Sequence, residues 1–415
     1  MRRLIAYSRS CALVRSDLWG VQRNKRRGYY HQQQVKVSKV RFMPETEAQC
    51  QTADEASLLI TCLRGLPFVV PHDTDWQALL GLAAAHGVLL LVHQSFLEKN
   101  IEIPGFFAAA VREQSNAAEM IAAELECLLK QFAERAIDVL PLKGPALAET
   151  LYGDVTMRSC NDLDLLVRRE DFQRAEVLLF DMGFVARATA GDYNRQFLRE
   201  GVMVELHFGV GPPRSLPFDL NGAWSRAGRG RFRGMPMRVM SDDDLVLFLC
   251  LHGLKHGFSR LIWILDVGRA LGKAQHCSPE ELVQSARRQG LEQALLIGCE
   301  LVRETLPRQL PQGMDAVIAA SPKAAERARL AVARLFAGAG ATNDPEIWCS
   351  SLQTDWSARR RWRRRLGFFA PTITDYAWAE RHRIYRGLAP VLRPFRVLQK
   401  YGPSRVWRFL FPPQI

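Results

Sequence analysis

The chain has 415 residues and a formal net charge of +13; 48% of its residues are hydrophobic and 24% are charged. This length is sufficient for about two or three domains with a large core, and the composition is typical of a globular protein. No apolar run approaches the ~20 residues that a transmembrane helix requires, so no membrane span is expected. The nine cysteines include no Cys-x-x-Cys pair, which argues against a zinc site and favours a reducing, cytoplasmic location.

The positive charge is concentrated at the two ends of the chain. Residues 1–43 contain eleven Lys/Arg and one acidic residue, and residues 355–415 contain fourteen and three, so the region between them is net acidic. Residues 1–42 are Arg-rich, which is typical of a transit peptide or a disordered arm. We expect disorder there; upstream sequence that is not normally translated is the other interpretation.

Residues 43–135 are predicted to form an N-terminal helical region. Apolar residues recur at helical spacing, and Pro104 precedes a long amphipathic pattern that ends near Phe132. His86 and His93 lie in this region, and a lone histidine at helical spacing is more often structural than a ligand. No functional role is expected for either.

The next region, residues 136–240, opens with a short apolar strand at 139–142. The strand ends at Lys143-Gly144, and Pro145 suits the first turn of a helix that continues to Tyr152. Glycine at a helix N-terminus offers backbone N–H groups to a phosphate, and Lys143 adds a positive charge. The pattern predicts a phosphate-binding turn.

A second strand at 162–167 carries two aspartates. Residues two apart in a strand point to the same side, so Asp162 and Asp164 are expected to share one face. Two such carboxylates repel each other unless a cation lies between them, and Mg²⁺ is the predicted cation. Residues 202–208 alternate apolar and polar side chains, so Glu205 and His207 share the polar face of another strand. Three carboxylates beside a phosphate turn indicate in-line displacement at phosphorus.

Further strands are expected at 184–186, 193–198 and 235–240 of the same sheet, with a helix at 170–182. Residues 209–234 are rich in Gly, Pro and Arg, and we expect a long loop over the site. This order of elements predicts an α+β fold with a mixed sheet flanked by helices.

Residues 241–350 are predicted to form a second helical region. Ser241 is an expected N-cap, and the three acids after it favour a helix start over a metal site. His252 and His256 share a helix face, and with Lys255 they are candidates for the phosphate or acceptor side of a cleft. A pair of structural buried histidines is the equally weighted alternative.

Residues 351–415 form a basic tail in which Arg359–Arg365 and later arginines alternate with aromatic residues and prolines. Such a segment is suited to RNA, to the surface of an anionic membrane, or simply to solvent as a basic helix.

Several of these motifs occur together in one known family. Leu142-Lys143-Gly144, the spacing Arg158-x-x-x-Asp162-x-Asp164, Val204-Glu205-Leu206-His207-Phe208 and the stretch 251–263 resemble the bacterial uncharacterised nucleotidyltransferase family, part of the polymerase-β-like superfamily. The resemblance implies that Asp162, Asp164 and Glu205 are catalytic metal ligands and that residues 241–350 face the substrate. Most of that superfamily has Gly-Ser where this chain has Lys-Gly, and the Lys-Gly variant also resembles abortive-infection nucleotidyltransferase toxins.

The expected function is Mg²⁺-dependent transfer of a nucleoside monophosphate from an NTP. Lys143, Gly144 and Arg158 are the expected nucleotide contacts, and His207 joins the candidate cleft residues. The acceptor is a sugar phosphate, an RNA or a protein, and the resemblance favours a surface-polysaccharide pathway and peripheral membrane contact through the tail. The alternatives are a toxin-like tRNA nucleotidyltransferase and a non-catalytic nucleotide-binding accessory protein.

Overall fold

The computed structural model describes residues 55–187, 193–211, 218–274, 278–306, 310–335 and 384–410, together with residues 369, 375, 378, 379 and 382. The predicted arm at 1–42 and the run Arg359–Arg365 lie outside these residues. Among the described helices, none is long and apolar enough to cross a membrane.

Helices form the first part of the described chain, as predicted. They are α2 (Glu55–Arg64), α3 (Trp76–His86), α4 (Leu89–Glu98) and the 30-residue α5 (Gly105–Glu134). The Asp75 carboxylate caps α3 by accepting from the backbone N–H groups of Gln77 and Ala78. Pro104 precedes α5, whose start therefore agrees with the sequence pattern.

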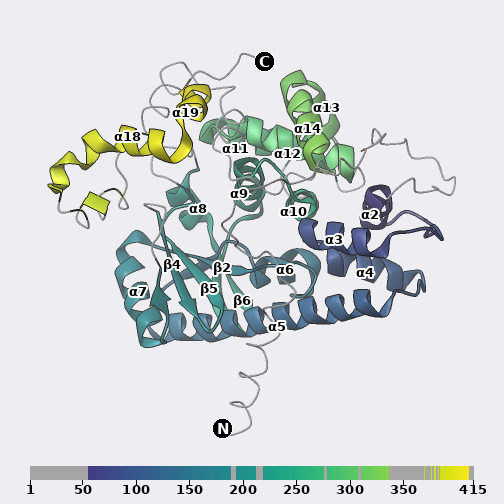
Figure 1. Ribbon diagram of the computed structural model, residues 1–415, viewed down its shortest axis with the longest axis horizontal. Helices are drawn as coiled ribbons and strands as arrows, with labels where there is room; N and C mark the ends of the chain where they lie inside the picture. The colour runs from purple at the N-terminus through teal and green to yellow at the C-terminus, as the bar shows by residue number, and fades with distance from the viewer. Residues whose placement is uncertain are drawn as a thin grey trace, which may run out of the picture. The chain divides into compact units, whose positions relative to one another are not determined.

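A mixed five-stranded sheet follows, in the order β1-β2-β5-β4-β3. Its strands are β1 (Val139–Pro141), β2 (Asp162–Val167), β3 (Val185–Ala186), β4 (Asn194–Arg199) and β5 (Val202–His207). Strands β2 and β5 are parallel, and the other pairs are antiparallel. Helix α6 (Pro145–Tyr152) connects β1 to the loop before β2, while η1 (Arg169–Asp171) and α7 (Phe172–Asp181) follow β2. The predicted α+β fold is confirmed; Figure 1 shows β2, β5 and β4 side by side above the long α5.

The two faces of this sheet differ in character. Leu163, Leu165 and Leu206 point to one face and are fully buried against the second half of α5, including Leu125 and Phe132. The opposite face carries the polar residues of β2 and β5. Because side chains alternate along a strand, burial of one face fixes which residues lie on the other.

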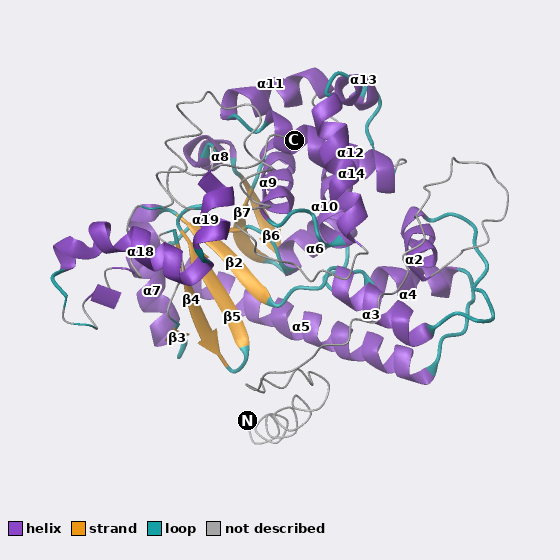
Figure 2. Cartoon of the chain, turned by 45° about the horizontal axis from the view of Figure 1, so that its top comes forward, coloured by secondary structure: helices purple, strands orange, loops and turns teal. Residues whose placement is uncertain are grey.

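The expectation for residues 209–240 is corrected by the structure. Within the predicted loop lie α8 (Leu220–Arg226) and β6 (Gly228–Phe232), and β6 pairs with β7 (Met235–Val239). These two strands form a separate two-stranded sheet instead of extending the main one. The orange strands of both sheets are visible in Figure 2. The sequence did not predict β6, because Gly and Arg dominate this strand and Phe232 is its only fully buried side chain.

Helices also form the second helical region. They are α9 (Asp242–Lys255), α10 (Leu261–Lys273), α11 (Pro279–Gln289), α12 (Glu292–Thr305), α13 (Met314–Ala319) and α14 (Pro322–Leu335). The predicted Ser241 cap is confirmed, since its hydroxyl accepts from the backbone N–H of Asp244. The acids that follow Ser241 lie in the first turn of α9, as predicted. One of them, the buried Asp244, pairs with Arg226 at 2.8 Å.

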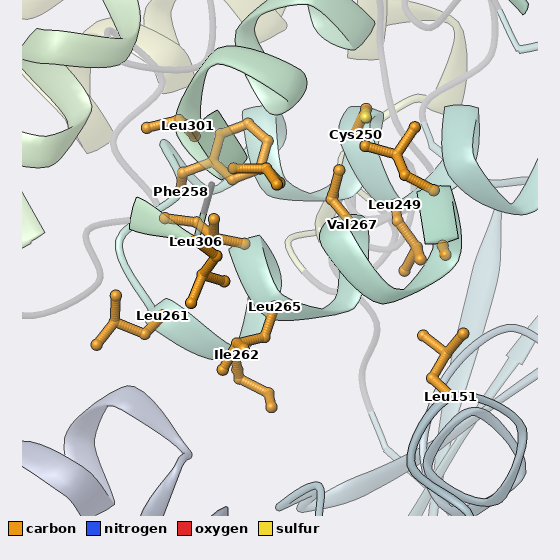
Figure 3. Packing of buried hydrophobic residues seen from close by; sticks show 14 of the residues in the cluster. Leu151, Leu249, Cys250, Phe258, Leu261, Ile262, Leu265, Val267, Leu301 and Leu306 are labelled. Carbon is orange, nitrogen blue, oxygen red and sulfur yellow. The ribbon is translucent and has the colours of Figure 1, made fainter. Parts of the chain in front are cut away.

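The helical regions before and after the sheet share one hydrophobic core, which includes Leu58, Phe96, Leu265 and Leu301. Figure 3 shows part of it, where side chains of α9, α10 and α12 interdigitate. Gly253 has no room for a side chain, because a Cβ there would lie 2.2 Å from the ring of Phe258. The tail contains η3 (Arg386–Leu388), α18 (Ala389–Tyr401) and α19 (Pro403–Leu410).

His86 joins the first helical region to the second. Its imidazole is 4% exposed, and Nδ1 accepts the backbone N–H of Leu261 at 3.4 Å. Arg260 strengthens the same junction by donating from Nε to the carbonyl of Ala85 at 2.9 Å. The expectation of a structural role for His86 fits this geometry.

Acid should weaken this junction. Burial, with a smaller contribution from Arg260, lowers the pKa of His86 from 6.5 to about 4. The unfolded chain therefore binds the proton first, so stability is lost as pH falls from about 6.5 to about 4. We expect His86 to account for about 2–3 kcal/mol of the lost free energy of unfolding. Urea denaturation of wild type and His86→Gln at pH 7 and pH 4.5 should show a shallower pH dependence in the variant. The exposed His72→Gln is the control, and equal slopes for His86→Gln and wild type would contradict the prediction.

Candidate active site

The polar face of the sheet gathers the predicted carboxylates. Strands β2 and β5 are parallel neighbours, and Asp164 pairs in register with Glu205. Asp162 and His207 lie two residues away along their own strands and therefore point to the same face. Four predicted site residues thus lie together, although about forty positions separate the two strands in the sequence.

His207 lies between two of the carboxylates. Its Nε2 is 3.0 Å from Oδ1 of Asp164 and 3.4 Å from Oε2 of Glu205. Ligand atoms of these three residues all lie within 4.8 Å of one another, the only such group of potential metal ligands among the described residues. Asp162 stands outside that group, on the same face and toward the start of β2. The predicted set was Asp162, Asp164 and Glu205, so the structure adds His207 at the centre.

Strand β4 holds Glu205 from the other side. The side-chain amide of Gln196 donates to Oε1 at 2.5 Å, and that of Asn194 donates to Oε2 at 3.0 Å. Sequence reasoning missed both residues. β4 begins with three consecutive polar residues, Asn194, Arg195 and Gln196, so its sequence does not indicate which of them face the site.

The turn after β1 approaches the same face. Gly144 precedes α6 with φ 77° and ψ −148°, a conformation that favours glycine. Lys143 reaches Asp164, with Nζ 2.9 Å from Oδ2. A cation beside a helix N-terminus is locally unfavourable. The ion pair with the buried Asp164 carboxylate gives Lys143 a counter-charge within the chain.

Comparison with known proteins agrees with this geometry. Residues 72–307 match the model of a family described as uncharacterised nucleotidyltransferase. The chain belongs to this family. The matched range covers more than half of the chain and contains every candidate site residue from Lys143 to His256. Among curated proteins, none matches the chain.

Partial similarity to solved structures is also found. The crystal structure of ANT(2")-Ia in complex with adenylyl-2"-tobramycin aligns at 14% identity and TM-score 0.31, over 40% of this chain and 95% of that one. The solution structure of the antibiotic-resistance factor ANT(2'')-Ia aligns at 17% identity and TM-score 0.24, over 32% and 71%. An antigenic nucleotidyltransferase-like protein from Paracoccidioides brasiliensis aligns at 18% identity and TM-score 0.28, over 36% and 75%.

Burial and neighbouring charges shift the pKa values of the titratable groups on this polar face. Burial, and then repulsion by Asp164, raises the pKa of Asp162 to about 6. Burial would also raise the pKa of Asp164, but Lys143 and the His207 hydrogen bond outweigh it and hold that pKa below its usual range. Burial opposes protonation of His207, yet its hydrogen bonds to Asp164 and Glu205 raise its pKa.

The donor set fits a hard divalent cation. Carboxylate oxygens from Asp164 and Glu205 converge, and Asp162 lies on the same face, two residues from Asp164. Oxygen ligands favour Mg²⁺ or Mn²⁺, while an imidazole in the same group also suits transition metals. The polar face of the sheet therefore has the ligands for a metal.

Arg158 supports the loop before β2. Its buried guanidinium donates from Nε to Asp266 at 2.9 Å, and Nη2 lies 2.9 Å from the same carboxylate. The hydroxyl of Tyr152 also donates to Asp266, at 2.9 Å. Arg158 therefore ties the loop to α10, a contact that the sequence did not predict. A direct contact between Arg158 and the nucleotide stays a prediction.

The predicted cleft residues of α9 form an aromatic and basic cluster. The ring centroids of His252 and His256 are 4.8 Å apart, and both rings contact Trp263. Lys255 Nζ is 3.4 Å from the hydroxyl of Tyr193, whose ring lies 6.1 Å from that of His207. Burial, and then the charges of Lys143 and other nearby cations, holds the pKa of His252 well below its usual range. The end of α9 thus adjoins the carboxylate face through Lys255 and Tyr193.

Proposed function

We propose that this chain transfers a nucleoside monophosphate from an NTP to an acceptor hydroxyl and releases pyrophosphate, with Mg²⁺ held by Asp162, Asp164 and Glu205. The observation that carries the proposal is the register pairing of Asp164 with Glu205, beside the Lys143-Gly144 turn. A bound divalent ion would supply charge stabilisation at the phosphates. The family match supports the reaction class.

The chain's own residues have distinct roles in this proposal. Lys143 and the N–H groups at the start of α6 bind the triphosphate, because both present positive charge. Glu205 is fixed by Gln196 and Asn194 and accepts the proton of the acceptor hydroxyl. His207 orients Asp164 and Glu205, because its Nε2 atom lies 3.0 Å from an oxygen of Asp164 and 3.4 Å from an oxygen of Glu205.

The cluster of His252, Lys255 and His256 is proposed to face the acceptor. It combines a cation with a group of aromatic rings in tilted and edge-on contact, which suits a phosphorylated sugar or a nucleic-acid end equally. The net acidic composition of the region between the basic ends disfavours a long nucleic acid, because a polyanion requires many phosphate contacts. A small anionic acceptor with a free hydroxyl is therefore the preferred class.

The position of a phosphorus label in the NTP distinguishes nucleotidyl transfer from phosphoryl transfer. The protein is incubated with Mg²⁺ and each NTP labelled at the α or the γ phosphorus, against sugar phosphates, tRNA and the protein alone. Transfer of the α label without the γ label supports nucleotidyl transfer, and transfer of the γ label would show phosphoryl transfer instead. Labelled tRNA would favour the toxin-like alternative. NTP binding without transfer of either label to any acceptor would favour the non-catalytic accessory protein.

Lys143→Ala should weaken both nucleotide binding and stability. Loss of a charge-assisted contact to the triphosphate should cost about 1.5–3 kcal/mol of NTP binding, and loss of the Asp164 ion pair should lower the free energy of unfolding by about 1–3 kcal/mol. Isothermal titration with a non-hydrolysable NTP and urea denaturation measure the two effects. Lys130→Ala, which removes an exposed lysine from α5, is the control. Unchanged NTP affinity with reduced stability would mean that Lys143 serves only as the counter-charge of Asp164.

A further inference from the structure

Helix α18 and its N-cap residue Leu388 expose an apolar stripe. Leu388, Val391, Phe395 and Leu398 are spaced at helical intervals and are 47%, 61%, 66% and 38% exposed. Residues three, seven and ten apart lie on one side of an α-helix, so these side chains form one face. An exposed apolar row of this kind is typical of an interaction surface.

The packed face of α18 is a different one. Ala389 and Val397 are 2% and 1% exposed, and Arg393 and Arg396 both contact the buried carboxylate of Asp375. At about 100° per residue these four positions lie nearly opposite the stripe. Packing within the chain therefore uses one side of the helix and leaves the apolar side outward.

The charge of the segment selects the partner. Besides Arg393 and Arg396, which pair with Asp375, residues 384–410 contain four Lys/Arg and no acidic residue. In α19, Trp407 is 63% exposed, and this residue type is favoured at membrane–water interfaces. A nucleic acid would be attracted by the cations, but it offers nothing to a row of mainly aliphatic side chains. An anionic lipid surface satisfies both features, because it presents phosphate groups above hydrocarbon.

We propose that α18 and α19 bind the surface of an anionic bilayer, with the stripe of Leu388, Val391, Phe395 and Leu398 inserted at the interface. The site is separate from the nucleotidyltransferase face and does not depend on the proposed reaction. Membrane binding requires both the apolar stripe and the basic residues. Insertion of the apolar side chains supplies affinity, and the cations supply the preference for anionic lipid.

Vesicle co-sedimentation of the full chain tests the proposal. We expect binding to vesicles of phosphatidylcholine with phosphatidylserine, much weaker binding to phosphatidylcholine alone, and loss of binding at high salt. The double substitution Val391→Ser with Phe395→Ser should weaken binding about tenfold or more, because it removes two side chains from the interface. The control is Val177→Ser with Phe180→Ser, which changes exposed apolar residues of α7 and should leave binding unchanged.

Three results would overturn the proposal. The first is absence of binding to anionic vesicles. The second is equal vesicle binding by wild type and the stripe variant, which would leave the basic charge as the sole cause. The third is a wild-type dimer in light scattering that the stripe variant converts to a monomer, with neither protein binding vesicles. That result would assign the stripe to a second copy of the chain.

Discussion

Asp164→Asn should reduce nucleotidyl transfer by about a thousandfold or more. Asp164 is the buried carboxylate that both Lys143 and His207 contact, and it lies in register with Glu205. In the proposed site it would be one of the residues that hold the metal. A bound metal ion contributes several kcal/mol to transition-state stabilisation, and each 1.36 kcal/mol changes the rate tenfold.

Single-turnover assays of transfer, with the acceptor identified by labelling, measure this loss. The variant also loses the negative charge that Lys143 and His207 contact, so its free energy of unfolding should fall by about 1–3 kcal/mol. Circular dichroism must first show that it folds. Glu205→Gln, which changes the carboxylate in register with Asp164, provides a second test if Asp164→Asn does not fold. Asp73→Asn changes an exposed acid and should be indistinguishable from wild type. Full activity of both site variants would show that the carboxylate face is not the catalytic site.

Asp266→Asn should cause the largest loss of stability, about 3–5 kcal/mol in the free energy of unfolding. The substitution removes the charge that faces the buried guanidinium of Arg158, whose side chain is 5% exposed. An uncompensated buried charge is far more costly than the loss of a surface ion pair. Since Arg158 lies in the loop that precedes Asp162, the loop should also shift and transfer activity should fall.

The double substitution Arg158→Met with Asp266→Leu separates the structural role of this pair from a nucleotide contact. Removal of both charges should restore much of the stability, because no charge remains buried without its partner. If the restored variant binds NTP normally, Arg158 acts by positioning the loop; if it binds NTP weakly, Arg158 also contacts the nucleotide. Glu292→Gln breaks the exposed pair with Arg287 and should cost less than about 1 kcal/mol. A similarly small effect of Asp266→Asn in urea denaturation would contradict the proposed importance of the buried pair.

Local pattern determined several features of this protein from the sequence alone. Alternation placed Asp162 and Asp164 on one face of a strand, and it placed Glu205 and His207 on one face of another. The Lys143-Gly144-Pro145 sequence predicted a strand end and a helix start, which β1 and α6 confirm. These features were predictable because side-chain period, proline and glycine restrict the backbone within a few residues.

Contacts between distant segments were decided only by the tertiary structure. Pairing of β2 with β5 brought His207 between Asp164 and Glu205, and pairing of β4 with β5 brought Gln196 to Glu205. Alternation gives the face of a strand but not its neighbour or register, which depend on packing of the whole sheet.

The ion-pair partners of the buried charged residues were also decided only by the tertiary structure. Arg158 and Asp266 lie 108 positions apart, and only folding shows that they meet in a buried pair. Lys143 looked like an isolated cation at a helix start, but the structure gives it Asp164 as a partner. The sequence therefore predicted the acidic and imidazole groups on the polar face of β2 and β5. The tertiary structure decided which of them neutralise one another, because the cost of a buried charge depends on neighbours that local sequence does not specify.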